Sequence, residues 1–305
     1  MTKLALKVDV DTWRGTRDGV PRLVELFARH QAGATFLFSL GPDHTGRAIR
    51  RVFRRGFLQK VSRTSVVEHY GIRTLLYGTL LPGPDIGRRE AVLMRGVRDA
   101  GFEVGIHTWD HIRWQDFVAG KDAAWTEREM NKAAQRFEQI FGQPPRTHGA
   151  AGWQMNTAAY AHEATLQLDY ASDGRGRCPF QPVDAEGRVL GVPQLPTTLP
   201  TLDELIGLDG LTADNVHQVI LDQTSTPPQT GHVYTLHAEL EGLRLLDTLD
   251  RLLSGWKQQG YQLVSCAEMF AGLDVGQLPR CQVEMGEIPG RSGTLALQGP
   301  AVVSS

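Results

Sequence analysis

Short apolar segments alternate with amphipathic helical segments along most of this chain, and this alternation limits the possible fold more than any other feature. Runs rich in β-branched and aromatic residues predict strands near residues 3–9, 33–39, 103–107, 146–150, 167–172, 231–237 and 261–265. Strands that alternate with helices form parallel sheets with the helices outside them. We therefore expect an α/β barrel of about seven parallel strands, with a doubly wound open sheet as the alternative.

Two helical segments have a clear apolar stripe. In residues 126–141 the stripe follows Thr126 and Glu129, which predict a capping box at the start of the helix. Residues 242–256 repeat the stripe with leucines and a tryptophan. Both segments are expected to pack against the sheet with their apolar faces.

The last thirty residues have a different composition from the rest. From Gly276 onward the chain is rich in Gly, Pro and Ser and has no convincing stripe. We expect a barrel domain over residues 1–275 and a C-terminal extension over residues 276–305 that is poorly structured or wraps the surface.

The composition argues against several classes of protein. The formal net charge of −2 is close to zero, which argues against general nucleic-acid binding, because that needs an excess of positive charge. The three cysteines are too widely spaced for a disulfide framework or a cysteine zinc site, which fits a reducing compartment. No stretch of about 18 apolar residues is present, and Asp9 and Asp11 interrupt the N-terminal apolar run. A soluble or peripherally attached protein is expected.

One segment departs from the alternation of strands and helices. Residues 47–63 contain seven basic residues and no acidic residue, interleaved with apolar side chains. The segment is either a solvated helical face or an interfacial segment, where each Lys or Arg near an anionic leaflet contributes about 1 kcal/mol. The mostly uncharged residues that follow favour a membrane surface or a lipid ligand. The candidate membrane-binding residues are Arg50, Arg51, Arg54 and Arg55, within an insertion at about residues 44–84.

Acidic and imidazole side chains collect where the predicted strands end. In a barrel of parallel strands these ends share one rim, where catalytic groups lie. Asp9 and Asp11 end the first strand, His107 ends the third, and His237 ends a late strand. A phosphatase motif of the type DxDx(T/V) is disfavoured because Trp13 occupies the fifth position.

The segment Gly105–His111, "GIHTWDH", places two histidines four residues apart. It is not the zinc-protease motif HExxH, because threonine rather than glutamate follows His107. One carboxylate with two imidazoles is a common ligand set for Zn²⁺, Co²⁺, Mn²⁺ or Fe²⁺. Asp11, His107 and His111 would supply this set.

Four of these motifs, in order along the chain, resemble the polysaccharide deacetylase (NodB-homology) family. They are "DVD" at the end of the first strand, "ATFLFSLG" on the second, "HTWDH" on the third and "YTLH" on a late strand. The resemblance implies a distorted (β/α) barrel that holds one divalent metal ion. It also implies metal ligands at Asp11, His107 and His111, a general base at Asp9 and a general acid at His237.

The chain departs from the broad family at three motifs. Val10 separates two aspartates that are usually adjacent, "RTHGAAGW" from Arg146 replaces an Arg-x-Pro motif, and "DYASD" lacks its usual tryptophan. The family motifs still suggest that Arg146 and Asp173 pair to orient Asp9, with a structural salt bridge as the alternative.

Three further residues are candidate substrate contacts. Arg175 is expected to contact a substrate phosphate or to pair with an acid. Trp109 and Trp153 are expected either to bound the sugar pocket or to pack in the interior.

Eight collinear motifs within residues 1–275 resemble one branch of the family, which removes the N-formyl group from a polyprenyl-phosphate-linked amino sugar in bacterial lipid A modification. This resemblance implies a lipid-linked sugar and a membrane surface as partners, no nucleic acid, and a peripheral location on the cytoplasmic face of the inner membrane. The alternatives are a metal-dependent deacetylase of another amino sugar or of a peptidoglycan-type glycan, and a non-catalytic lipid- or carbohydrate-binding barrel. The intact Asp9, Asp11, His107, His111 and His237 argue against a binding protein.

Overall fold

The computed structural model describes residues 1–48 and 72–302, and its central feature is one parallel sheet. Its seven strands are β1 (Lys3–Val10), β2 (Thr35–Ser39), β3 (Glu103–Thr108), β4 (Thr147–His148), β5 (Tyr170–Ala171), β7 (His232–His237) and β8 (Gln262–Val264). Each lies at a segment that the sequence predicts as a strand. The order is β5-β4-β3-β2-β1-β7, with β8 also paired to β1, and the sheet curls into a half-barrel. The predicted distorted barrel of about seven parallel strands is confirmed.

Strand β1 is the centre of the sheet. It pairs with β7 from Leu4 to Asp9, with β2 from Lys7 to Val10 and with β8 from Lys3 to Ala5. Because β7 occupies one edge along nearly the whole strand, β2 and β8 share the other edge. Seven of the eight residues of β1 are buried, as expected for a parallel strand covered on both faces.

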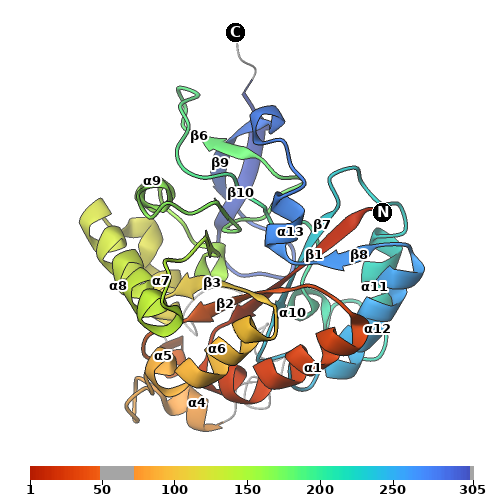
Figure 1. Cartoon of the computed structure of the whole chain (residues 1–305), viewed down its shortest axis with the longest axis horizontal. Coiled ribbons are helices and arrows are strands. Elements are labelled where there is room, and N and C mark those ends of the chain that lie inside the picture. The colour runs from red at the N-terminus through yellow and green to blue at the C-terminus, as the bar shows by residue number, and fades with distance from the viewer. Residues whose placement is uncertain (49–71, 303–305) are drawn as a thin grey trace.

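Helices surround the sheet on its outer side (Figure 1). The longer helices are α1 (Val20–His30), α6 (Ala91–Asp99), α8 (Ala123–Phe141), α9 (Thr157–Thr165), α11 (Val216–Gln223) and α12 (Leu246–Gln258). The shorter ones are α4 (Ile72–Leu76), α5 (Ile86–Arg89), α7 (His111–Phe117), α10 (Leu202–Leu205) and α13 (Cys266–Phe270). The described residues also include a π-helix, η1 (Gly15–Gly19), and the 3-10 helices η3 (Val118–Gly120), η4 (Ala151–Trp153) and η5 (Val275–Gln277).

An aromatic cluster joins the outer helices to the sheet. The ring of Phe36 on β2 packs edge-on against Phe27 of α1 and against Phe102, with ring centroids 6.0 and 5.5 Å apart. Phe36 is completely buried, so the cluster stabilises the sheet chiefly by removing aromatic surface from water. This packing holds α1 and the residue before β3 against β2.

Helix α8 begins earlier than the sequence pattern predicts. The helix starts at Ala123, and the carboxylate of Asp122 accepts a hydrogen bond from the N–H of Trp125 at 2.8 Å. Thr126 and Glu129 therefore lie inside the helix and form no capping box at its start, so that prediction is wrong. The N-cap oxygen satisfies one of the orphan N–H groups of the first turn, and here Asp122 supplies it.

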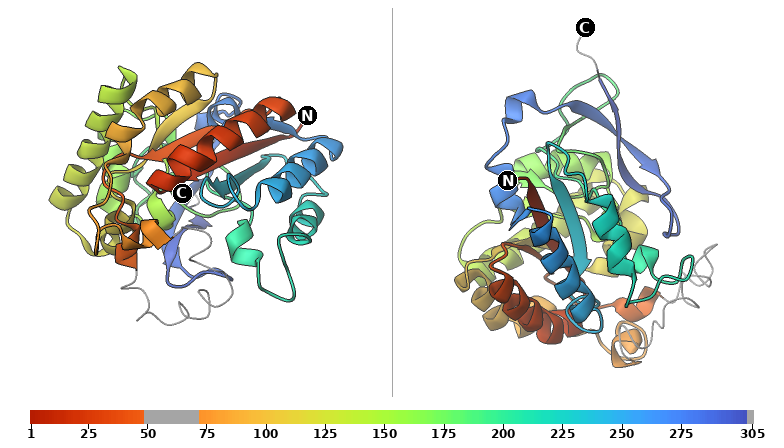
Figure 2. Two further views of the ribbon diagram at one scale, coloured as in Figure 1. Left: turned by 90° about the horizontal axis from the view of Figure 1, so that it is seen from below. Right: turned by 90° about the vertical axis from the view of Figure 1, so that its right-hand side faces the viewer.

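The C-terminal segment is built into the fold. Strand β9 (Arg280–Gly286) pairs antiparallel with β10 (Leu295–Ala301) and parallel with β6 (Gln181–Val183), forming a second, three-stranded sheet. Figure 2 shows this sheet projecting beside the half-barrel. Ala296 of β10 is fully buried in a hydrophobic cluster with Trp114 and Ala151.

Among the described residues, no helix is long and apolar enough to span a bilayer.

Replacing Asp122 with alanine should lower the free energy of unfolding by about 1 kcal/mol, because the first turn of α8 loses its capping oxygen. Denaturant unfolding would measure the change. The matched control is Glu127→Ala, an exposed carboxylate of the same helix that is not at the cap. Equal stability of the two variants would contradict a cap at Asp122.

Candidate metal centre and active site

The carboxyl ends of three strands bring the predicted catalytic residues to one rim. Asp9 of β1 and His237 of β7 are register partners in the parallel ladder, so their backbones lie side by side. His107 lies near the end of β3, and Asp11 follows β1 directly. The side-chain contacts described below bring Asp11, His107 and His111 together at this rim.

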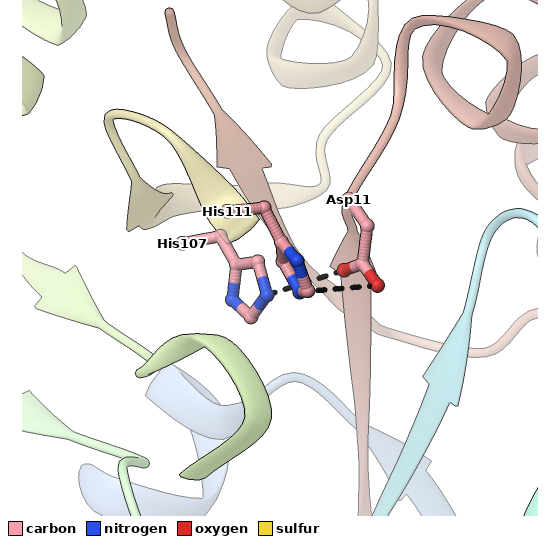
Figure 3. A group of neighbouring side chains, drawn as sticks. All are labelled: Asp11, His107 and His111. Atoms are coloured by element: carbon pink, nitrogen blue, oxygen red, sulfur yellow. Dashed lines mark ion pairs between the residues drawn. The ribbon is translucent and has the colours of Figure 1, made fainter. Parts of the chain in front are cut away.

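Asp11, His107 and His111 form a compact group of ligand atoms (Figure 3). His107 Nε2 lies 3.2 Å from Asp11 Oδ1, and His111 Nε2 lies 3.2 Å from Asp11 Oδ2. Two donor atoms that each lie about 2.1 Å from one ion are roughly 3.0–3.4 Å apart, so the observed spacing suits a divalent cation. Among the described residues, His107 Nε2 and Asp11 Oδ1 are buried without a hydrogen-bond partner, and a cation between them would coordinate both atoms.

Contacts behind the ligands fix their orientation. His107 Nδ1 donates a hydrogen bond to the carbonyl oxygen of Gly149 at 2.7 Å, which directs the lone pair of Nε2 toward Asp11. His111 is the first residue of α7, and Asp110 caps that helix by accepting from the N–H of Arg113 at 3.1 Å. The other oxygen of Asp110 pairs with His44 Nδ1 at 2.6 Å. Asp110 therefore holds the turn and a histidine, and it is not one of the grouped ligand atoms.

The charges of the group favour an ionised carboxylate at Asp11. Burial by itself would raise the pKa of Asp11, but the imidazoles of His111 and His107 outweigh it and hold that pKa well below its usual range. For His107, burial opposes protonation, whereas Asp9 and Asp11 raise its pKa. A carboxylate that remains ionised beside two imidazoles is a suitable metal ligand.

A buried lysine accompanies the candidate base. Lys7 lies two residues before Asp9 on β1, so both side chains project from the same face of the strand. Lys7 Nζ lies 3.3 Å from Asp9 Oδ2 and donates to the carbonyl oxygen of Ser172 at 3.0 Å. Gly149 leaves room for it, since a Cβ at that position would lie 2.9 Å from Lys7 Cε. Lys7 was not among the predicted site residues.

The predicted pairing of Arg146 with Asp173 is wrong. The Arg146 side chain is 62% exposed and binds the carboxylate of Asp169 on the surface, at 2.6 Å. Asp173 is completely buried, and its carboxylate lies 2.6 Å from His148 Nδ1. The cation beside Asp9 is therefore Lys7, which comes from the same strand as the base.

His148, Asp173 and Glu163 form a second buried group. Burial, reinforced by the neighbouring Asp173, raises the pKa of Glu163 well above its usual range. Although burial opposes ionisation of Asp173, the imidazole of His148 lowers its pKa. At 2.6 Å, the contact between His148 and Asp173 is a short hydrogen bond, closer than two ligands of one ion usually lie.

His237 is held by the turn that follows β7. Its backbone N–H donates to Glu241 Oε2 at 2.8 Å, and its ring meets the ring of Trp153 edge-on with centroids 6.4 Å apart. Burial raises the pKa of Glu241 from 4.5 to about 7. Glu241 thus holds the backbone of His237, and the ring of Trp153 borders its imidazole.

The two predicted aromatic residues have different surroundings. Trp153 is 1% exposed, and it donates from Nε1 to Thr197 Oγ1 at 3.1 Å. Trp109 is partly buried, with the Arg136 guanidinium carbon 5.1 Å from its ring centre. Trp153 therefore packs in the interior beside His237 rather than lying open to solvent.

Arg175 pairs with an acid, which was one of its two predicted roles. Its Nη1 lies 2.6 Å from Glu204 Oε1, and its guanidinium carbon lies 5.0 Å from the ring centre of Trp153. Arg291 approaches the same carboxylate oxygen at 3.2 Å and the same ring at 4.3 Å. The four candidate membrane-binding residues, Arg50, Arg51, Arg54 and Arg55, lie outside the described residues.

The half-barrel and its Asp-His-His group define the class of this protein. A sequence model described as polysaccharide deacetylase matches residues 3–171, which is more than half of the chain. The chain belongs to the polysaccharide deacetylase family, and it is a hydrolase of that type.

More particular relatives match over nearly the whole length. A Shewanella sediminis protein named as a probable 4-deoxy-4-formamido-L-arabinose-phosphoundecaprenol deformylase is 37% identical over 303 residues, covering 99% of this chain and 96% of that protein. A Wigglesworthia glossinidia brevipalpis protein of the same name is 29% identical over 287 residues, covering 93% and 98%. The solved structure of a probable polysaccharide deacetylase from Pseudomonas aeruginosa shares the fold, with a TM-score of 0.58, 14% identity and coverage of 88% and 90%.

Replacing Glu241 with glutamine should change how stability depends on pH. Because the pKa of Glu241 is higher in the folded chain, its contribution to stability is complete below about pH 4.5 and is lost as the pH rises to about 7. A shift of that size corresponds to at most about 3 kcal/mol. Urea unfolding between pH 4.5 and 7.5, with chelator present so that metal release does not contribute, should show a smaller loss for the variant.

The exposed carboxylate of Glu25 on α1 offers the matched control, Glu25→Gln. Its curve should follow that of the unmodified protein. If Glu241→Gln also follows that curve, the raised pKa of Glu241 is disproved.

Proposed function

We propose that this enzyme hydrolyses the N-formyl group of 4-deoxy-4-formamido-L-arabinose carried on undecaprenyl phosphate. The product is the 4-amino-4-deoxy-L-arabinose lipid that modifies lipid A and gives polymyxin resistance. The proposal rests on one observation, that Asp9 and His237 flank the Asp11, His107 and His111 group at the rim of the half-barrel. Similarity to proteins named as deformylases, over 99% of the chain, supports the choice of substrate.

Asp11, His107 and His111 would hold one divalent cation, and Zn²⁺, Mn²⁺, Co²⁺ and Fe²⁺ all suit this donor set. When bound there, the cation supplies Lewis acidity, which polarises the formyl oxygen and makes water easier to deprotonate. The three ligand residues leave positions open for water and substrate, as in catalytic rather than structural metal sites.

Asp9 is the general base and His237 is the general acid. Asp9 accepts the proton of the attacking water, and its ion pair with Lys7 at 3.3 Å orients the carboxylate. His237 donates a proton to the departing amine nitrogen, and the hydrogen bond from its backbone N–H to Glu241 holds this residue at the end of β7. Hydrolysis of an amide needs both groups, because the amine leaves readily only when it is protonated.

Because the proposed substrate is carried on a lipid, the enzyme must reach it at a membrane surface. The basic and apolar residues of the 47–63 segment would bind the anionic surface, with Arg50, Arg51, Arg54 and Arg55 as the principal contacts. The enzyme would then act as a peripheral protein at the cytoplasmic face of the inner membrane. Arg175 and His237 both contact the ring of Trp153.

Incubation with the formamido-arabinose lipid and with its acetamido analogue, followed by mass measurement, tests the substrate, the acyl group and the metal together. We expect loss of formyl only, abolished by a chelator and restored by a divalent cation. Preferential loss of acetyl would indicate a deacetylase of another amino sugar. Binding of the lipid without any hydrolysis would indicate a non-catalytic barrel.

Asp9→Ala and His237→Ala should each lower the rate of amide hydrolysis by at least about 10²-fold, while bound metal stays nearly unchanged. Asp9→Asn repeats the test with the shape of the side chain retained. The control is His232→Gln, a histidine at the opposite end of β7 that bonds to Thr198. Metal loss in Asp9→Ala would reassign that residue as a ligand.

Replacing four arginines with glutamine should weaken binding to anionic liposomes at least about tenfold, because each contributes roughly 1 kcal/mol near such a surface. The variant changes Arg50, Arg51, Arg54 and Arg55 together. A charge-matched control changes four exposed arginines elsewhere, Arg22, Arg29, Arg128 and Arg188. Liposome flotation measures both, and unchanged binding of the first variant would exclude this surface.

A further inference from the structure

The turn after β7 places the buried carboxyl group of Glu239 at the end of β1. Glu239 is only 2% exposed, and its Oε1 accepts three hydrogen bonds. The donors are the N–H of Asp11 at 3.0 Å, the N–H of Thr12 at 2.7 Å and the hydroxyl of Thr12 at 2.8 Å. All three belong to the segment that carries the metal ligand Asp11.

The space for this carboxylate is built into the opposite segment. A Cβ at Gly15 would lie 1.9 Å from Glu239 Oε1, so only glycine admits the carboxylate there. The N–H of Gly15 donates to Thr12 Oγ1 at 3.0 Å, which turns the Thr12 hydroxyl proton toward Glu239. Residues 11–15 therefore enclose one carboxyl oxygen that comes from the turn after β7.

Glu239 does not belong to the metal ligands themselves. The ligand atoms of Asp11, His107 and His111 lie within 4.8 Å of one another, and Glu239 is not in that group. Its Oε1 is directed instead at the backbone of Asp11. Three donors therefore converge on one buried carboxyl oxygen.

The same turn holds the candidate acid. The N–H groups of Leu240 and Glu241 both donate to the carbonyl oxygen of His237 at 3.0 Å, so Glu239 lies within a rigid turn. Gly242 completes it, because a Cβ there would lie 2.5 Å from the carbonyl oxygen of Ala238. One turn therefore connects the strand that ends in His237 with the strand that ends before Asp11.

We propose that Glu239 is a positioning residue that holds the backbone of Asp11 and Thr12 in place and thereby sets the affinity of the site for its divalent cation. This inference rests on the proposed metal-dependent function. Asp11 follows β1 in a segment with no ladder partner of its own, and Glu239 replaces the missing sheet contacts. Outer contacts of this kind typically change metal affinity by about 10- to 100-fold when they are removed.

Metal titration of the metal-free protein tests the proposal without any substrate. Calorimetry with Co²⁺ should give a 10- to 100-fold weaker Kd for Glu239→Ala. For Glu239→Gln, whose amide oxygen can still accept these hydrogen bonds, the loss should be smaller. The visible absorption of bound Co²⁺ should also shift in Glu239→Ala, since it reports the geometry of Asp11.

The matched control is Glu129→Gln, another buried glutamate, which pairs with Lys132 in α8. It should bind Co²⁺ as the unmodified protein does. Thermal unfolding checks that each variant is folded, and Glu239→Gln carries the test if Glu239→Ala is not. Unchanged Co²⁺ affinity and spectrum in a folded Glu239 variant, or equal weakening in Glu129→Gln, would overturn the proposal.

The same titration separates this inference from the proposed function. If the formamido lipid is not hydrolysed but Glu239→Ala still binds Co²⁺ weakly, only the substrate is wrong. If the lipid is hydrolysed and the Glu239 variants keep their affinity, only the positioning role is wrong.

Discussion

The structure depends on charged residues that are buried on the central strand. β1 is covered on both faces, yet it carries Lys7 and Asp9, whose side chains are almost completely buried. A buried charge is tolerated only when it is paired and hydrogen-bonded. Lys7 therefore needs Asp9 and the Ser172 carbonyl, and Asp9 needs Lys7. Asp9 comes from the same strand as Lys7, and the Ser172 carbonyl lies just after β5. The position of the candidate base therefore depends on this pairing.

The strands could be predicted because their signal is local. Each apolar run stands between helical segments with a different period, so the alternation is visible without any knowledge of contacts. The start of α8 was misplaced for a similar local reason. Asp122 and Thr126 are both good capping residues, and the pattern of apolar side chains does not distinguish between them.

The candidate ligands and the residues behind them differ in how far their contacts reach along the chain. His107 and His111 share one short segment, and their spacing was a usable signal. Lys7 meets Ser172 across 165 residues, and Glu239 meets Asp11 across 228. The predicted pairing of Arg146 with Asp173 was wrong for another reason. It precedes the two-residue strand β4 and faces outward, and no sequence pattern shows the direction of a side chain at the edge of so short a strand.

The C-terminal hairpin of β9 and β10 affects the order in which the site is completed during synthesis. Ala296 fills a core position, and the Arg291 guanidinium lies 4.3 Å from the ring centre of Trp153, which itself borders His237. During synthesis the half-barrel strands emerge before these residues do, because domains fold as their segments leave the ribosome. The wall beside His237, the proposed general acid, is thus completed only after the half-barrel strands have been made. A nascent chain in which the proposed metal ligands have already emerged still lacks this wall until Arg291 and β10 follow.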